Sequence, residues 1–341
     1  MSSPLATVGI LSIGEMGMGI AKLLIAYNYR VVTNIEGRSE DTHARVKQSN
    51  IEALPTDISL VSESDYILSI VPPRDALATA KRITTAFASQ PTPKKTPFYY
   101  LDLNAVSPRT TREIAALFKS TAPAIKFIDG GIIGGAPAPK NSTTAPSTTV
   151  SHHPDPSTTS HAWNRPSIPL SGPDSLFDAP LSGAQLAETL NARHVSGEIG
   201  AASGLKCCFA STTKGFTALC IQAFTTAQRM GVLEELKEEI QTRMPSVLPR
   251  AVNGMTGMPP KAYRWVREME EIGVTFAEEG GFTGGKDGEG IFGQVAEVYR
   301  VVADETVLGE EKTERRKRGL TLDDVTVAMS EGLDRKRRKK D

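Results

Sequence analysis

The sequence predicts an α/β domain with a parallel, doubly wound sheet, followed by an all-α domain. Roughly the first 130 residues alternate short apolar runs with helical patterns, which is typical of strands joined by crossover helices. Beyond Gly200 the strand patterns stop, and longer apolar stretches with helical spacing replace them. A chain of 341 residues also has the length of two domains rather than one.

The N-terminal strands are predicted from five apolar runs that each end in polar or turn-forming residues. They are 7–13, 30–35, 65–73, 98–105 and 126–135. After the first run, apolar residues recur at helical spacing and predict an amphipathic helix: Ile20, Leu23, Leu24 and Tyr27. Parallel α/β sheets place their functional loops at the carboxyl ends of strands, so the residues after these runs are candidates for a site.

The C-terminal half is predicted to be helical and unusually apolar. The stretch 203–243 contains no proline and predicts one long buried helix, followed by the amphipathic helix VLEELKEEIQTR. The stretches 261–280 and 290–304 predict two more helices. Burying the segment FTALCIQAF would need more partner helices than these, so we expect a homodimer.

The expected domain boundaries follow changes in composition. Residues 1–197 form the α/β domain, 198–310 the helical substrate and dimerisation domain, and 311–341 a charged, partly disordered tail. Residues 136–167 are rich in Pro, Ser, Thr and Ala and are expected to be a flexible insertion. Three histidines fall within it, and we interpret them as solvated rather than as metal ligands: His152, His153 and His161.

Composition excludes several classes of function. The formal net charge of +0 predicts no general attraction to nucleic acid or to anionic membranes. Three cysteines make a poor disulfide framework, and the start MSSPLATVGIL lacks the features of a secretory signal, so a cytoplasmic location is expected. No apolar run is long enough to span a bilayer. The basic cluster DRKRRKKD at the end of the chain leaves nuclear import open.

The segment ILSIGEMGMG predicts a loop that binds a dinucleotide. Such a loop needs a tight turn, a close approach of backbone to pyrophosphate, and close packing of helix on strand, and glycine serves each need. Gly14 and Gly17 fill the second and third glycine positions, while Ser12 stands at the first. The predicted contacts to the cofactor are therefore Ser12, Ile13, Gly14, Glu15, Met16 and Gly17, in a Rossmann-like domain.

The end of the second strand bears on the kind of cofactor. Glu36 lies where an acid could bind a ribose hydroxyl, as in NAD enzymes. Arg38 and Ser39 combine a guanidinium with a hydroxyl, which suits a 2′-phosphate and favours NADP. Further contacts to the cofactor are predicted after the later strands, and they come from Val71, Pro72 and Asn104.

Four segments in this order resemble the β-hydroxyacid dehydrogenases, the superfamily of 6-phosphogluconate and 3-hydroxyisobutyrate dehydrogenases. They are VGILSIGEMGMGIAKLL, LDLNAVSP, FIDGGIIGGAP and GAASGLKCCFASTTKG. The stretches SGLKCCFASTTKG and YRWVREMEEI are similar to a branch with a 6-phosphogluconate-dehydrogenase-like C-terminal domain. The resemblance implies a nicotinamide-dependent oxidoreductase acting on a small hydroxy acid or related alcohol.

The resemblance also implies roles for individual residues. Lys206 matches the lysine that serves as general acid/base on the first helix of the second domain. Gly134 and Gly135 match the paired glycines that bind a substrate carboxylate. Lys214 lies two helical turns beyond Lys206 on roughly the same face, so its spacing makes it the second candidate for contact with substrate. No metal site is implied.

Two departures from the family pattern leave alternatives open. Ile133 replaces the serine that commonly precedes the paired glycines, and Phe209 and Ala210 stand where an asparagine is common. These changes favour a less polar substrate than phosphogluconate. The alternatives are an imine or ketone reductase on the same scaffold, in which the lysine is often replaced, and a catalytically silent redox sensor that binds NADP.

Overall fold

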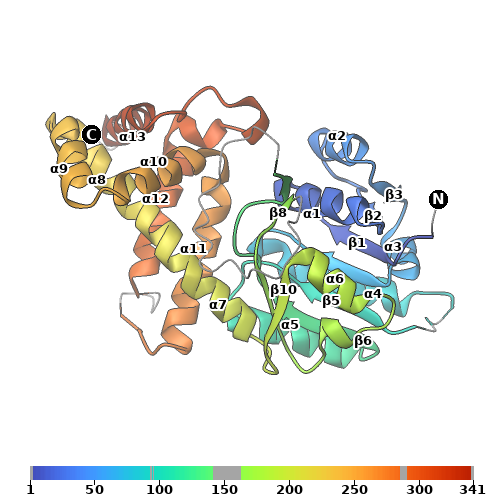
Figure 1. Ribbon diagram of the computed structural model, residues 1–341. Helices are drawn as coiled ribbons and strands as arrows, with labels where there is room; N and C mark the ends of the chain where they lie inside the picture. Colours follow the sequence, from blue (N-terminus) through green and yellow to red (C-terminus); the bar gives the residue numbers. More distant parts are fainter. Residues whose placement is uncertain (1–2, 93, 95, 141–162, 285–289, 339–341) are drawn as a thin grey trace. The chain divides into compact units, whose positions relative to one another are not determined.

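The computed structural model of the protein describes residues 3–92, 94, 96–140, 163–284 and 290–338 (Figure 1). The chain divides into two compact units, Met1–Lys206 and Cys207–Asp341. Most of the expected insertion 136–167, including its three histidines, lies outside the described residues. At its two ends, β7 (Ala138–Pro139) pairs with β8 (Trp163–Asn164) in an antiparallel bridge.

The first unit contains an eight-stranded sheet in the order β10-β9-β6-β5-β4-β1-β2-β3. The strands are β1 (Thr7–Leu11), β2 (Arg30–Asn34), β3 (Glu52–Leu54), β4 (Tyr66–Ser69), β5 (Phe98–Asp102), β6 (Ile125–Gly130), β9 (Ile168–Ser171) and β10 (Ala192–Ser196). The six strands from β6 to β3 are parallel, whereas β9 runs antiparallel to β6 and is paired in parallel with β10. The predicted α/β class with a dominantly parallel sheet is confirmed.

Helices cover both faces of this sheet, which makes it doubly wound (Figure 1). One face buries apolar residues of α1 (Glu15–Ala26), α2 (Glu40–Gln48) and α6 (Gly183–Leu190). The other buries residues of α3 (Asp57–Glu63), α4 (Ala76–Ala88) and α5 (Pro108–Thr121). The central strands β4 and β5 are apolar in all but their last position because both of their faces are buried.

The second unit is helical, and α7 (Ala201–Ala210) crosses the division between the units. The other helices are α8 (Phe216–Met230), α9 (Leu233–Arg243), α10 (Val247–Gly257), α11 (Ala262–Glu278), α12 (Gly290–Glu305) and α13 (Leu322–Arg338). The sequence did not predict α10, because its proline and two glycines are typical of loops. Pro249 lies in the first turn, where backbone N–H groups have no partner within the helix.

The long helix expected from residue 203 onward is interrupted by a π-helical turn, Ser211–Gly215. Three successive hydroxyls bond back to carbonyl oxygens of α7: Ser211 to Cys208, Thr212 to Phe209, and Thr213 to Ala210. Such side-chain bonds compete with the backbone ladder and distort a helix. The helix resumes as α8 and ends at Gly231, whose φ of 75° is left-handed.

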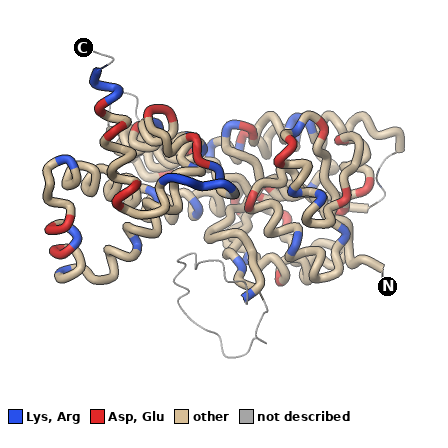
Figure 2. Tube along the Cα trace, turned by 90° about the horizontal axis from the view of Figure 1, so that it is seen from above, with Lys and Arg blue, Asp and Glu red and all other residues tan. Residues whose placement is uncertain are grey.

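The segment 311–341, predicted to be a charged, partly disordered tail, contains the helix α13 (Leu322–Arg338). Leu322, Val325 and Met329 recur at helical spacing, and α13 buries them in the core of the second unit. The high charge of the segment concealed this narrow apolar stripe. Lys and Arg gather instead at the C-terminal end of α13 (Figure 2). Among the described residues, no helix is both long and apolar enough to cross a membrane.

Candidate functional site

The carboxyl ends of the central strands bring a row of residues into register. Leu11 pairs with Ser69, Ser69 with Asp102, Asp102 with Asp129, and Asp129 with Ser171. Because paired residues of neighbouring strands share one face of a sheet, the four polar members form a continuous buried polar row. The loops that leave this edge contain most of the predicted site residues.

The predicted glycine loop lies between β1 and α1 and has the expected shape. Ser12 has a φ of 75°, a left-handed conformation that glycine adopts without strain. A Cβ on Gly17 would lie 2.2 Å from the Ser12 carbonyl oxygen, so only glycine fits where α1 crosses the loop. A Cβ on Gly14 would meet no heavy atom within 4 Å, which leaves space beside the start of the helix.

This loop suits a phosphate group. Gly14 is the N-cap of α1 and offers no side chain to the first N–H groups, which a ligand can therefore use. Glu15 and Met16 form the first turn, exposed and half-buried respectively. Ile13 is buried, and its carbonyl oxygen accepts a hydrogen bond of 2.7 Å from Arg45 Nε, which supports the loop from α2.

The end of β2 leads into an open hollow of about 310 Å³. Glu36, His43 and Leu54 are among the residues that line it, from the loop after β2, from α2 and from β3. Arg38 and Ser39 are exposed and directly follow two residues of the lining in the sequence, but they do not line the hollow themselves. The structure thus places an acid, rather than the predicted guanidinium, on the wall of the hollow.

Asn104 links the ends of β4 and β5. Its Oδ1 accepts a hydrogen bond of 2.7 Å from the Val71 N–H, and its Nδ2 donates to Ser69 Oγ at 3.1 Å. The side chain is 2% exposed, so these bonds use much of its hydrogen-bonding capacity. Asn104 therefore shapes the turn at Val71, and the half-buried Pro72 follows directly. Direct contact with a cofactor stays a prediction.

Asp102 is a buried carboxyl beneath this turn. Its Oδ1 accepts the Asn104 N–H at 3.0 Å, while its Oδ2 has no hydrogen-bond partner. Burial raises the pKa of Asp102 to about 7; the Asn104 N–H opposes this shift, and the neighbouring Asp129 adds to it. This group could not be predicted from the sequence, because an Asp that ends an apolar strand is common in turns.

Lys206 is placed next to the end of β6. Its Nζ donates a hydrogen bond to the Ile132 carbonyl oxygen. A Cβ on Gly131 would lie 2.8 Å from Lys206 Cβ, so the glycine allows the lysine stem to pass against the backbone. The predicted general acid/base therefore lies beside the segment that carries the predicted substrate glycines.

That segment continues from the lysine to the helix of the glycine loop. Ile133 exchanges two backbone hydrogen bonds of 2.9 Å with Ser167, which fixes the strand just before the paired glycines. Gly134 has a φ of 127°, a conformation rarely open to other residues. Gly134 and Gly135 are both half-buried. A Cβ on Gly19 of α1 would lie 3.0 Å from Pro137 O, so the segment touches α1.

Asp129 is a functional candidate that the sequence analysis missed. Its Oδ2 accepts hydrogen bonds from Ser171 Oγ at 2.7 Å and from the N–H groups of Gly200 at 2.9 Å and Ala202 at 3.1 Å. Ser203 adds its N–H at 3.3 Å, and its hydroxyl bonds to Oδ1 at 2.5 Å. The only available signal was an acid between an apolar strand and two glycines.

Lys214 lies in the π-helical turn of the second unit. Its ammonium forms an ion pair with Glu268 and lies 5.0 Å from the centroid of the Trp265 ring. The Tyr299 hydroxyl donates to the Lys214 carbonyl oxygen. The Lys214 side chain is only 16% exposed, and these contacts with residues of its own unit are sufficient to explain its burial. The predicted contact with substrate stays a prediction.

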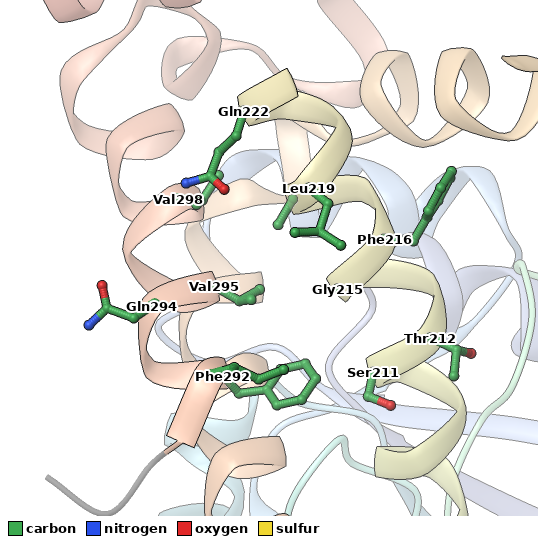
Figure 3. A pocket seen from close by; sticks show the side chains of 12 residues that line it. Ser211, Thr212, Gly215, Phe216, Leu219, Gln222, Phe292, Gln294, Val295 and Val298 are labelled. Carbon is green, nitrogen blue, oxygen red and sulfur yellow. The ribbon is translucent and has the colours of Figure 1, made fainter. Parts of the chain in front are cut away.

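The second unit also carries an apolar pocket of about 480 Å³ between the start of α8 and α12 (Figure 3). Leu219, Val295 and Phe292 extend between the two helices, whereas Gln294 points away from them. Leu219 is 62% exposed, which is high for a residue in the middle of an apolar helix. No cluster of three or more His, Cys, Asp or Glu side chains suited to a metal occurs in the described part of the chain.

Comparison with known proteins identifies two families along the chain. The model described as the NAD binding domain of 6-phosphogluconate dehydrogenase matches residues 7–149. A second model, a domain of unknown function (DUF1932), matches residues 227–302. An uncharacterized 28.5 kDa protein of Methanothermus fervidus is 24% identical over 241 residues, which span 69% of this chain and 76% of that protein.

Two solved structures illustrate the shared fold. Mycobacterium tuberculosis 3-hydroxyisobutyrate dehydrogenase with L-serine has a TM-score of 0.57 and 15% identity, covering 94% of this chain and 98% of that one. A variant imine reductase from Myxococcus stipitatus with NAD⁺ has a TM-score of 0.50 and 16% identity, covering 87% and 92%. The predicted resemblance is confirmed at the level of domains and fold: residues 7–149 match the NAD binding domain of 6-phosphogluconate dehydrogenase, residues 227–302 match DUF1932, and the fold is similar to that of 3-hydroxyisobutyrate dehydrogenase.

Proposed function

We propose that the protein is an NADP-dependent oxidoreductase that interconverts a small hydroxy acid, or a related alcohol, and its carbonyl form. One observation carries this proposal. The segment 131–137 contacts Lys206 at its start and α1 of the glycine loop at its end. It thereby links a group that can carry a proton to the loop that would hold the dinucleotide.

The glycine loop provides the binding site for the cofactor. Gly14 leaves room beside the N-terminus of α1, where N–H groups and the helix dipole attract pyrophosphate. The nicotinamide, when bound, supplies the hydride chemistry, and the protein binds and orients it. Arg38 and Ser39 favour the 2′-phosphate of NADP, while Glu36 on the wall of the hollow keeps NAD open.

Lys206 is proposed to handle the proton on the substrate oxygen. Oxidation removes the hydroxyl proton as the carbinol carbon loses a hydride, and reduction returns it. An ammonium can donate up to three hydrogen bonds, so the bond to Ile132 O is compatible with a second bond to substrate. The backbone around Gly134 would bind the substrate carboxylate, as in the family that the segment resembles.

The test of this function measures binding and turnover separately. Gly14→Ala should fold normally, because its Cβ meets no protein atom, yet it should weaken NADPH binding in a fluorescence titration at least about 10-fold by filling the phosphate space. Lys206→Met should keep NADPH affinity and lower turnover of a responsive hydroxy acid by about 10²–10⁴-fold.

The control for binding is Gly257→Ala in α10, where a Cβ also meets no heavy atom within 4 Å. It should bind NADPH as the wild type does. Turnover of cyclic imines but not of hydroxy acids would favour the imine reductase alternative. Tight NADPH binding with no turnover on either panel would favour a redox sensor and contradict the proposal.

A further inference from the structure

We infer that Asp129 is a positioning residue for Lys206, holding α7 at the height and rotation that bring the lysine to its place beside Ile132. The inference rests on the proposed role of Lys206 as general acid/base. It adds a residue that neither the sequence pattern nor the family comparison assigned.

The contacts of Asp129 fix the start of α7 in space. Three backbone N–H groups, from Gly200, Ala202 and Ser203, point at one carboxylate oxygen. Backbone N–H groups can only donate, so the facing atom must accept. These N–H groups come from Gly200, just before α7, and from the first turn of the helix, whose N–H groups have no partners within the helix itself. The Asp129 side chain, at the end of strand β6, therefore caps the N-terminus of helix α7.

The carboxyl group is itself held rigidly. Asp129 is fully buried at the end of β6, and Ser171 of β9 donates to the same oxygen at 2.7 Å. Ser203 donates its hydroxyl to the other oxygen, and Thr111 of α5 lies 2.8 Å from that hydroxyl. The strands β6 and β9 thus determine where the cap lies, and through it where α7 begins; Thr111 contacts the Ser203 hydroxyl but not Asp129.

The geometry of strand and helix connects this cap to the lysine. Lys206 lies four residues beyond Ala202, a rise of about 6 Å along a helix. Gly131 lies two residues beyond Asp129, about 7 Å along an extended strand. The two advances match, and Gly131 contacts both the Ala202 carbonyl oxygen and the Lys206 stem. The short segment 129–132 therefore caps the helix at one end and binds the lysine amine at the other.

In this arrangement the position of the Lys206 amine depends on the hydrogen bonds between Asp129 and the start of α7. A shift or rotation of α7 would move Lys206 away from Ile132 and from any substrate aligned by the neighbouring glycines. Displacement of a catalytic group by about 1 Å can cost about 10²-fold in rate. A cap of purely structural value would instead change stability and leave the properties of the lysine unaltered.

The test compares Asp129→Asn with Thr111→Val. The asparagine keeps the shape, and its amide oxygen can still accept from N–H groups, but it replaces one acceptor with a donor and removes the charge. The valine removes the buried hydrogen bond between the hydroxyls of residue 111 and Ser203, and it leaves the bonds of the α7 N–H groups in place. We expect Asp129→Asn to lower kcat about 10- to 100-fold with unchanged NADPH affinity, and Thr111→Val to lower it less than about 2-fold.

A second readout does not depend on turnover. Lysines are reductively methylated with ¹³C, and the Lys206 signal is identified by its loss in Lys206→Arg. In Asp129→Asn, displacement of Lys206 from the Ile132 carbonyl oxygen should remove a hydrogen bond that favours the ammonium, and it should lower the titration midpoint of this signal by about 0.5 pH unit or more, with Thr111→Val unchanged. Ser171→Ala, which removes one donor to Asp129, is a milder variant expected to lower kcat less than Asp129→Asn.

The outcomes separate the two proposals. A midpoint and a kcat in Asp129→Asn that equal those of wild type or of Thr111→Val would overturn the positioning role. A wild type that binds NADPH but turns over no substrate would defeat the proposed function only. In that case the titration of the Lys206 signal alone decides the inference.

Discussion

At the scale of single residues, the polar row at the carboxyl ends of the strands contains two carboxyl groups, Asp129 and Asp102, that differ in their hydrogen bonds. Asp129 accepts hydrogen bonds at both oxygens, whereas Asp102 has one partner and a bare Oδ2. The two residues pair in register on adjacent strands. Burial raises the pKa of Asp102 and repulsion from Asp129 adds to this shift, so Asp102, which has fewer hydrogen bonds, is the one that favours its neutral form.

Asp102 predicts a pH dependence of stability. Its folded pKa of about 7 lies above the ordinary value of 3.8, so between these values the folded state binds more protons than the unfolded state. Its contribution to the free energy of unfolding is complete below about pH 4 and is lost as pH rises through 7. Asp102→Asn should flatten this decline, as measured by urea unfolding between pH 5 and 8.

The matched control for that measurement is Asp57→Asn, which changes an acid on α3 that lies in an ion pair with Arg82. It should keep the decline of stability toward pH 8. A decline of the same slope in Asp102→Asn and in wild type would show that another group titrates there. The result bears on function too, because Asp102 supports the turn of Asn104 and Val71.

At the scale of elements, sequence patterns predicted those parts whose signals are local. The five strand runs of the first unit correspond to β1, β2, β4, β5 and β6, and the helices expected at 261–280 and 290–304 correspond to α11 and α12. Spacing of apolar residues carries this information directly. The glycine loop was equally visible, because the close approach of α1 to the loop leaves no room for a Cβ at Gly17, even though Ser12 occupies the position with positive φ.

Other elements depend on partners far away in the sequence and were missed for that reason. The antiparallel pairing of β9 with β6 joins strands that are separated by about 40 residues in the sequence, many of them polar. The cap that Asp129 provides to α7 spans more than 70 positions. Helix α13 was hidden because its charged residues outnumber the few apolar ones that the core of the second unit buries.

The burial of α13 yields a prediction about stability. Met329→Ala should lower the free energy of unfolding by about 2–5 kcal/mol, because Met329 is 3% exposed in the core and its removal leaves a cavity. Val327→Ala on the same helix should change it by less than about 0.5 kcal/mol, because Val327 is 37% exposed. Thermal or urea unfolding measures both. Equal, small effects would mean that α13 is not part of the folded core.

At the scale of the whole molecule, each of the two units has a hydrophobic core of its own. The proposed chemistry depends on residues of the first unit, including Lys206 at its end. The second unit instead displays apolar surface. Phe282 and Ile291 are 70% and 72% exposed, and both line a second apolar pocket of about 370 Å³ that shares Ile291 and Phe292 with the pocket of Figure 3. Apolar surface gathered in this way is uncommon on a monomer.

We expect a second copy of the chain to cover this surface, as the apolar character of the helical half predicted. Leu219→Glu would place a charge in the pocket between α8 and α12, and it should convert a dimer to a monomer in size-exclusion chromatography with light scattering. Met230→Glu is the matched control, because Met230 is 71% exposed near the end of the same helix but lines neither pocket. It should remain a dimer. A wild type that is monomeric at micromolar concentration, or a dimer that persists in Leu219→Glu, would place the contact elsewhere or exclude it.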